Sequence, residues 1–431
     1  MNSTLSTCFT VILSILLMLL NKNKAWKMRL ASILQRSVSK MTKHVPISTN
    51  FRLEQSKHFT EAVGLLELYD SLIYLQEYRA RALKYNATLY HMSKSVDPGQ
   101  IEQLRALQYF EKLEQINDAV GDNSTTTQLI VENSLIKLLR NNRLDSENGK
   151  ELLSVFKGLG FEVDGDSALK RIPVHKLTLS PSSRQSRVNE AISHMCRDWH
   201  SSFKAEREPL THFIISKVKG LKLKGKTLLV VPGSGAGGLA YEIACAFPEF
   251  DVHSVELSTL MYLCNEFALD YNETINIKPF AQHFSGQLSV QQQTAGFDIN
   301  LAQIRRPANL EVHLGNFCNF QPGATYDNIV VLSAFFIDTA ENIFDYFDAV
   351  EGLKTCCSKL HWINIGPLKY GTRPKVQFTD EELTHLRKIR KWKDLFHDAD
   401  TEKLSGYLTN KKSLYQGFYG LVRFHSEYTG E

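Results

Sequence analysis

The chain has 431 residues, of which 43% are hydrophobic, and a formal net charge of +4. This length and apolar content allow two domains, or one large domain with an extension, and the mild charge gives no indication of nucleic-acid binding. Seven cysteines without a CxxC pair argue against a disulfide framework or a zinc site and favour reduced thiols, so we expect a cytoplasmic or nuclear protein.

Residues 1–53 form a basic tail that contains eight Lys or Arg and no Asp or Glu. Within this tail, residues 8–20 are an apolar run that is shorter than the roughly 20 residues needed to span a membrane. The run lacks a preceding positive region and an evident cleavage site, while the following MRLASILQRSVSK is basic and contains serine, as transit peptides do. The tail is therefore compatible with membrane contact through residues 8–20, with a targeting segment, or with a dispensable extension.

Residues 54–185 are expected to form a helical region. Apolar residues recur there at three- and four-residue intervals, as in AVGLLELYDSLIYLQEY and IEQLRALQYFEKLEQIN. Pro98-Gly99 is expected to separate two helices, and GDNSTTT at residues 121–127 is interpreted as a loop. This region is either a scaffold that packs against the following domain, which we favour, or a cap over an active site.

Residues 186–431 alternate predicted strands and helices, which indicates a doubly wound α/β sheet. A final antiparallel hairpin is more typical of Rossmann-like methyltransferases than of NAD dehydrogenases. A long Gln-rich insertion at residues 271–309 is interpreted as a loop that is either functional or disordered. The predicted strands are 227–231, 251–257, 310–314, 326–332 and 360–365, followed by a late antiparallel strand at 415–427.

The segment TLLVVPGSGAGGLAYEIA predicts a buried strand, a glycine turn and a helix N-terminus that approaches a ligand closely. Glu256 ends the next apolar run, at the distance expected for a residue that accepts hydrogen bonds from ribose hydroxyls. The turn fits GxGxxG, which suits a dinucleotide such as NAD, and also GxGxG, which suits S-adenosylmethionine. Spacing alone leaves these two cofactors and a purely structural turn open.

Several further motifs occur together with this turn. They are RDW at 197–199, KAERE at 204–208, NEFAL at 265–269, PFAQHFS at 279–285, LGNF at 314–317, FFIDTAENIFDY at 335–346 and WINIGPLKY at 362–370. Over roughly residues 186–431 the sequence resembles the carnosine N-methyltransferase family. This resemblance implies a seven-stranded Rossmann-like methyltransferase sheet with one final antiparallel strand. It also implies S-adenosylmethionine as cofactor and an imidazole nitrogen of carnosine, a β-alanyl-histidine dipeptide, as methyl acceptor.

The resemblance implies roles for individual residues of the cofactor site. Arg197 would contact the carboxylate end of the methyl donor, Glu256 its ribose, and the glycine turn its methionine part. His194 and Asn316 stand where the family usually has Gln and Asp. The full set of expected cofactor residues is His194, Arg197, Gly233, Gly235, Glu256, Asn316 and Phe317.

The same resemblance assigns Asp338 and Tyr415 to substrate binding, with Tyr419 as a weaker candidate. The Asp338 carboxylate would accept a hydrogen bond from one imidazole N–H and leave the other ring nitrogen as nucleophile; its alternative role is a helix N-cap. Methyl transfer by direct displacement requires no metal and no covalent enzyme nucleophile, so we expect neither. The oligomeric state is not indicated.

The chain departs from the family at one substrate position. Gly371 replaces a histidine that helps to hold carnosine, and Arg373 or Lys375 are candidates to bind a carboxylate instead. The expected acceptor is therefore carnosine or a related histidine-containing peptide, with a protein histidine as the alternative. A catalytically degenerate, membrane-tethered interaction protein remains a second alternative.

Overall fold

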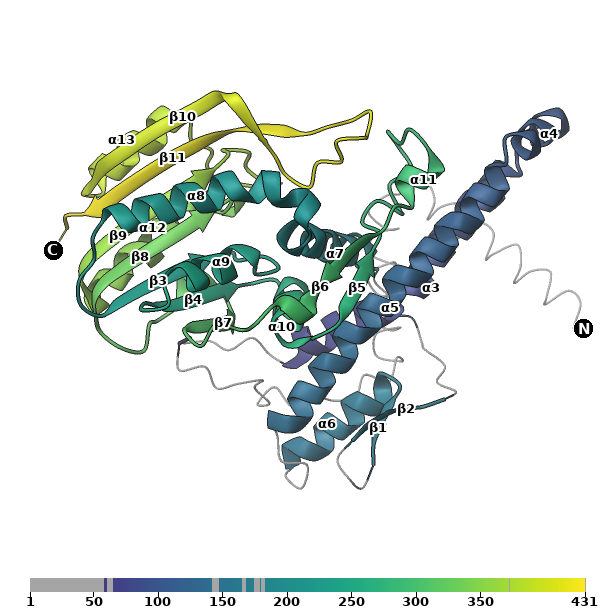
Figure 1. Ribbon diagram of the computed structural model, residues 1–431, viewed down its shortest axis with the longest axis horizontal. Helices are drawn as coiled ribbons and strands as arrows, with labels where there is room; N and C mark the ends of the chain where they lie inside the picture. The colour runs from purple at the N-terminus through teal and green to yellow at the C-terminus, as the bar shows by residue number, and fades with distance from the viewer. Residues whose placement is uncertain are drawn as a thin grey trace, which may run out of the picture.

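The computed structural model describes residues 58–59, 65–141, 147–164, 168–173, 179, 183–371 and 373–430. The basic tail predicted at residues 1–53 lies outside this set. No helix in these ranges combines the length and the apolar character that crossing a membrane requires. The structure has a mixed α/β body and a long helical hairpin that extends from it (Figure 1).

The body is built on a seven-stranded sheet with the order β10-β11-β9-β8-β3-β4-β7. β11 runs antiparallel to both of its neighbours, and the other neighbouring pairs are parallel. This order and the single reversed strand confirm the predicted methyltransferase fold. The strands are β3 (Thr227–Pro232), β4 (Asp251–Glu256), β7 (Leu310–Leu314), β8 (Tyr326–Ala334), β9 (Cys357–Gly366), β10 (Trp392–Gly406) and β11 (Phe418–Tyr428).

Helices cover both faces of the sheet because its central strands are buried on both sides, as their continuous apolar runs predict. On one face, α8 (Lys204–Gly220) and α9 (Gly238–Ala246) share an apolar cluster with Leu229 and other strand residues. On the other face, α12 (Ile343–Gly352) and α13 (Asp380–Ile389) pack in a second cluster. The carboxyl ends of the strands between these layers are where ligands bind in such sheets.

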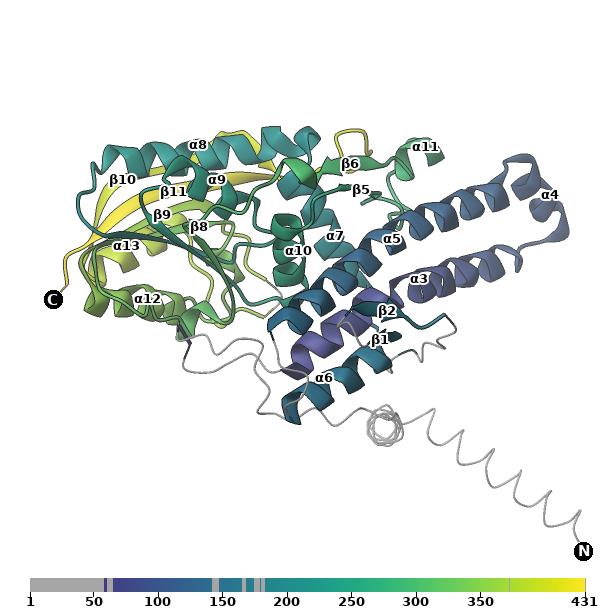
Figure 2. The same ribbon diagram turned by 60° about the horizontal axis from the view of Figure 1, so that its bottom comes forward.

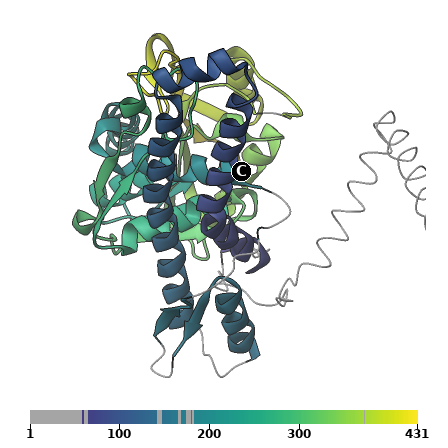
Figure 3. The ribbon, with the colours of Figure 1, turned by 90° about the vertical axis from the view of Figure 1, so that its right-hand side faces the viewer.

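The helical region contains two long helices that lie side by side, α3 (Leu65–Ser93) and α5 (Tyr109–Asn141). The short α4 (Pro98–Ala106) joins them at the far end of the hairpin (Figure 2). Figure 3 shows the same pair from the side, with α4 crossing between their tips. Pro98 is the first residue of α4, where its missing N–H costs no hydrogen bond, so the predicted helix break is confirmed.

The loop predicted at residues 121–127 is wrong, because this segment lies inside α5. Polar side chains of this segment form hydrogen bonds with other elements. Asn123 donates hydrogen bonds to the Tyr78 hydroxyl and the Lys278 carbonyl, both at 3.0 Å, and its carbonyl oxygen accepts from the Lys278 N–H at 2.8 Å. The Thr126 hydroxyl donates to the Asn276 carbonyl at 3.1 Å. A helix can therefore continue through residues of poor helix propensity when tertiary contacts satisfy them.

The hairpin is attached to the body through a shared apolar core. Residues of α3, α5 and α6 (Glu147–Gly158) cluster with residues of α7 (Gln185–Trp199) and α10 (Thr259–Asp270). A small antiparallel pair, β1 (Phe161–Val163) and β2 (Leu169–Arg171), follows α6. The contacts agree with a scaffold that packs against the sheet domain.

The insertion at residues 271–309 is neither a plain loop nor disordered. It forms an antiparallel pair, β5 (Thr274–Ile277) and β6 (Phe297–Asn300), with the short helix α11 (Val290–Gln293) between them. The last strand was predicted to begin at Tyr415, but β11 begins at Phe418. Its antiparallel direction is confirmed.

Candidate active site

The turn between β3 and α9 has a backbone that side chains rarely tolerate. Gly235 has φ +60° and Gly237 has φ +96°, both in the left-handed region. A side chain at Gly237 would overlap the Asn265 amide. A Cβ at Gly235 would lie 3.8 Å from Asp198 Oδ2 and 3.9 Å from His194 Nδ1. The bare backbone of this turn therefore faces the helix that carries the expected methionine-binding residues.

Glu256 is the last residue of β4 and lies beside this turn, since β3 and β4 are parallel neighbours. Its Oε2 accepts a hydrogen bond from the Gly235 N–H at 2.8 Å, and its Oε1 accepts one from the Ser258 N–H at 2.7 Å. Burial raises the pKa of the Glu256 carboxyl to about 7, although the N–H donors oppose this shift. The expected ribose ligand is thus fixed in place and titrates near neutral pH.

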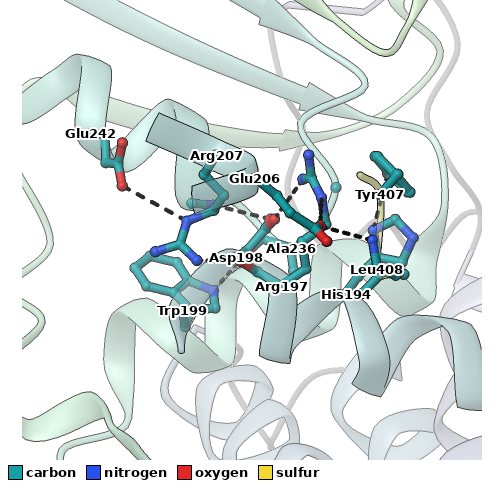
Figure 4. A network of polar contacts seen from close by, with 12 residues as sticks. His194, Arg197, Asp198, Trp199, Glu206, Arg207, Ala236, Glu242, Tyr407 and Leu408 are labelled. Carbon is teal, nitrogen blue, oxygen red and sulfur yellow. Dashed lines mark hydrogen bonds and ion pairs between the residues drawn. The ribbon is translucent and has the colours of Figure 1, made fainter. Parts of the chain in front are cut away.

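His194 and Arg197 lie three residues apart on α7 and project into the same site (Figure 4). The Arg197 guanidinium lies over the Tyr407 ring at 4.2 Å and over the Phe335 ring at 5.7 Å. Its Nη1 donates to Asp198 Oδ1 at 3.2 Å, and its Nε is buried without a hydrogen-bond partner among the described residues. Burial lowers the pKa of His194, which favours the neutral ring. α7 therefore presents a guanidinium flanked by the Asp198 and Glu206 carboxylates, and beside it an imidazole whose neutral form is favoured.

Tyr407 reaches this site from the segment that joins β10 and β11, and a buried carboxylate holds that segment down. The Glu206 carboxylate on α8 accepts hydrogen bonds from the Leu408 N–H at 2.9 Å and the Thr409 N–H at 3.0 Å. The Tyr407 hydroxyl lies 3.5 Å from His194 Nδ1. Figure 4 shows Glu206, Arg197 and Tyr407 in one network of polar contacts. Glu206 and Tyr407, which are far apart in the chain, thus together cover one side of the site.

A cavity of about 60 Å³ lies between these elements. Its lining includes His194, Arg197, Asp198, Gly233, Gly235 and Tyr407. Small-molecule sites commonly enclose about 300–1,000 Å³, so this cavity has room for one end of a ligand rather than for a whole nucleoside. It lies among the residues predicted to bind the methionine part of the cofactor, and that role stays a prediction.

Asn316 and Phe317 follow β7, at the same edge of the sheet. Asn316 is exposed, and its Oδ1 accepts a hydrogen bond from the Cys318 N–H at 3.0 Å. Phe317 is buried, with ring centroids 6.5 Å from Phe320 and 5.9 Å from Phe336. Phe317 therefore also belongs to the apolar core, and the adenine contacts expected for both residues stay predictions.

Asp338 lies in a short 3-10 turn just beyond β8. The turn follows Phe335, whose φ of +51° bends the chain sharply at the strand end. Asp338 is buried, and its Oδ2 accepts a hydrogen bond from the Lys369 N–H at 3.0 Å. Burial raises the pKa of the Asp338 carboxyl to about 6, so it is ionised at neutral pH. The N-cap of α12 is Asn342, so the alternative capping role of Asp338 is wrong.

The two candidate tyrosines differ in their surroundings. Tyr415 precedes β11 and is 81% exposed. Tyr419 lies within β11, packs against Phe335 at 6.1 Å between ring centroids, and accepts a hydrogen bond from Lys369 Nζ at 3.2 Å. Tyr419, the weaker candidate by sequence, is therefore the one linked to Asp338 through Lys369, and the role of Tyr415 stays a prediction.

Sequence reasoning missed four residues of this site: Asp198, Glu206, Lys369 and Tyr407. Three of them lie inside motifs that carried the resemblance, namely RDW, KAERE and WINIGPLKY. Tyr407 has no local signal, because only the pairing of β10 with β11 brings it back over α7.

Comparison with known proteins agrees with this geometry. The family model described as carnosine N-methyltransferase matches residues 174–430. An uncharacterized protein of Saccharomyces cerevisiae is 37% identical over 99% of both chains. A carnosine N-methyltransferase of Schizosaccharomyces pombe is 28% identical over 54% of this chain and 68% of its own length.

A magnesium protoporphyrin IX methyltransferase from Synechocystis, solved with SAH, is similar with a TM-score of 0.31 and 12% identity, over 53% of this chain and 88% of that one. The fold assignment rests on the strand order and the family match. The chain belongs to the carnosine N-methyltransferase family, a family of S-adenosylmethionine-dependent methyltransferases.

Proposed function

We propose that this protein transfers a methyl group from S-adenosylmethionine to an imidazole nitrogen of carnosine or of a related histidine-containing peptide. The observation that carries this proposal is the buried Asp338, whose Oδ2 is held by the Lys369 N–H beside the strand ends that carry the cofactor residues. A buried carboxylate with one oxygen so fixed can orient an imidazole through the other.

The residues present fit the proposed cofactor. The buried Arg197 Nε lacks a hydrogen-bond partner among the described residues, and a guanidinium there suits the carboxylate of a methionine moiety. Gly235, whose φ of +60° disfavours any side chain, presents its bare backbone to His194 and Asp198. Glu256 provides a carboxylate at the distance after the glycine turn that is typical of ribose-binding residues. His194, Arg197, Gly233, Gly235 and Glu256 would hold the cofactor, with Asn316 and Phe317 beside its adenine.

When bound, S-adenosylmethionine supplies an electrophilic methyl group on a sulfonium. The protein's contribution is alignment and exclusion of water. The Asp338 carboxylate accepts a hydrogen bond from one N–H of the substrate imidazole. This hydrogen bond selects the tautomer and stabilises the positive charge that develops on the ring. Neutral imidazole, with a pKa of about 6.5, is already a competent nucleophile near neutral pH.

The acceptor is best tested with labelled S-adenosylmethionine and a panel of carnosine, homocarnosine, anserine, free histidine, histidine peptides and whole-cell protein. Label in carnosine, homocarnosine or a short peptide supports the proposal. Label only in protein histidines favours the alternative of a protein histidine methyltransferase. No transfer to any imidazole, with cofactor binding intact, contradicts the proposed reaction.

The Gly371→His variant is expected to methylate carnosine at least about tenfold faster in kcat/KM than the wild type. A Cβ at Gly371 meets no atom within 4 Å, so the structure has room for the family's histidine. The measurement is the initial rate at saturating S-adenosylmethionine. Gly99→His serves as the control, since its Cβ also meets nothing within 4 Å and the residue lies on the distant α4. An unchanged rate would mean that this position does not tune acceptor choice.

Affinity for S-adenosylmethionine is expected to rise about tenfold between pH 6 and pH 8, because the Glu256 pKa is raised to about 7 and ribose hydroxyls donate best to a carboxylate. The folding stability of the unliganded protein changes with pH in the opposite direction. A carboxyl pKa raised on folding stabilises the fold below its unfolded pKa of about 4.5, and that stabilisation is lost as pH rises through about 7. Calorimetric Kd values at three pH values measure the effect. Glu256→Gln should abolish this component of the pH dependence, and an identical profile in both proteins would refute it.

A further inference from the structure

Three buried histidines and one glutamate converge at the edge of the sheet. His253 lies on β4, and Glu311 and His313 lie on the edge strand β7, which pairs with β4 in parallel. His58 comes from the described segment 58–59, far away in the sequence. The three histidines are 4–7% exposed, while the Glu311 side chain is 60% exposed.

These four side chains lie close enough together to form a coordination shell. The imidazole centroids lie 4.7–5.0 Å apart in all three pairs. The Nε2 atoms of His58, His253 and His313 lie 3.6, 3.9 and 3.8 Å from Glu311 carboxylate oxygens. One ligand atom from each residue lies within 4.8 Å of all the others. A zinc tetrahedron with bonds of about 2.0–2.1 Å has edges of about 3.3 Å, so small side-chain rotations would complete it.

The hydrogen bonding around the cluster also favours a ligand. The Nδ1 of His58 lies 2.9 Å from the Gln321 carbonyl oxygen, so its Nδ1–H donates there and its Nε2 lone pair faces the cluster. Such an outer hydrogen bond is what typically orients a metal-binding histidine. The Nε2 of His313 is buried without a hydrogen-bond partner among the described residues. A buried polar atom in that state costs free energy unless something binds it.

The segment that carries His58 is docked closely enough to provide a ligand. The Gln321 N–H donates to the His58 carbonyl at 2.7 Å, and Phe59 bridges to Phe320. Gly315 allows this docking, because a Cβ there would come within 2.5 Å of the Phe59 ring. His58 is therefore held at the sheet edge by contacts independent of any ion.

An ordinary buried polar cluster is the competing explanation. Such a cluster normally satisfies its ring nitrogens by hydrogen bonds. Here the Nε2 of His313 has no hydrogen-bond partner among the described residues, and its 3.8 Å separation from the Glu311 carboxylate exceeds hydrogen-bonding distance. Three imidazole nitrogens and one carboxylate within 4.8 Å of one another match the ligand types and number of a tetrahedral zinc ion.

We propose that His58, His253, His313 and Glu311 bind one structural zinc ion. Four protein ligands leave no open position, so the ion would brace the fold rather than take part in methyl transfer. The ion would link segment 58–59 to β7 and to β4, the strand that ends at Glu256. We expected no metal from the sequence, because methyl transfer needs none; these four ligands follow no zinc-motif spacing and meet only in the folded chain.

The experiment uses the full chain purified without chelators, with metal content measured by plasma mass spectrometry. About one zinc per chain is expected. Zinc added after chelation should raise Tm by about 5 °C or more, and cobalt(II) substitution should give the visible absorption of a tetrahedral site. Glu311→Gln should weaken zinc binding by about 10–100-fold, and because the side chain is exposed the fold should survive. His313→Asn should abolish binding.

The matched control is His425→Asn. His425 is also buried; it lies on β11 opposite Ile363, and its ring centroid is 5.5 Å from that of His361 on the neighbouring strand β9. This variant should keep its zinc. The proposal is overturned if the wild type holds no zinc and gains no stability from added zinc, if another metal occupies the site stoichiometrically, or if folded Glu311→Gln and His313→Asn bind zinc as the wild type does.

Discussion

Asp338→Asn is expected to lower kcat by about 10³-fold while S-adenosylmethionine affinity stays within about twofold. The asparagine keeps the size of the side chain and can accept the Lys369 N–H, so the turn should hold. It loses the charge that steadies the imidazolium and can offer an N–H where an acceptor is needed. Effects of this kind are commonly worth about 10²–10⁴ in rate. Methyl transfer under saturating donor and acceptor, together with calorimetry, measures the two quantities separately.

Asp345→Asn is the matched control for this prediction. Asp345 lies in the first turn of α12, a few residues further along, and its exposed carboxylate accepts from the Asn342 amide at 2.6 Å. Its turnover should stay near the wild-type value. Full activity in Asp338→Asn would remove Asp338 from the mechanism and with it the main support for an imidazole acceptor.

Glu256→Ala is expected to weaken S-adenosylmethionine binding by about 10²–10³-fold. Two hydrogen bonds from ribose hydroxyls to a carboxylate are worth about 3–4 kcal/mol together. The Glu256 carboxylate also accepts hydrogen bonds from the Gly235 and Ser258 N–H groups. Its removal therefore loosens the turn that faces the cofactor. Isothermal titration with S-adenosylmethionine and its demethylated product measures the loss.

Stability and binding must be separated in this variant. The pKa of Glu256 is raised to about 7, so the ionised side chain is unfavourable in the unliganded fold above that pH. Tm at pH 8 should therefore fall little on substitution, whereas affinity should fall steeply. Glu249→Ala, on the exposed stretch before β4, should change neither. Unchanged affinity in Glu256→Ala would show that the ribose does not reach this carboxylate.

The parts of the fold that sequence predicted are those with local signals. A buried run, a glycine turn and an acidic residue at the next strand end identified β3, α9 and Glu256, because each signal reflects the conformation or burial of its own segment. The prediction of a loop at 121–127 was wrong because Asn123 and Thr126 form hydrogen bonds with residues in and next to β5. These tertiary contacts override the poor helix propensity of the segment.

The parts that sequence could not predict depend on contacts between distant segments. Tyr407 enters the site because Glu206 binds the backbone of Leu408 and Thr409. The packing of Tyr419 against Phe335 likewise has no signal in the sequence around it. His58 and His313 meet across 255 residues of chain, the difference between their positions, so no spacing rule could pair them.

Calorimetric titration of the purified chain with S-adenosylmethionine, repeated with its demethylated product, tests most directly whether the ends of β3 and β4 hold the methyl donor. One site per chain is expected, with an affinity in the micromolar range that Glu256→Ala reduces by at least a hundredfold. No heat with either compound, from a protein that melts cooperatively, would contradict the account.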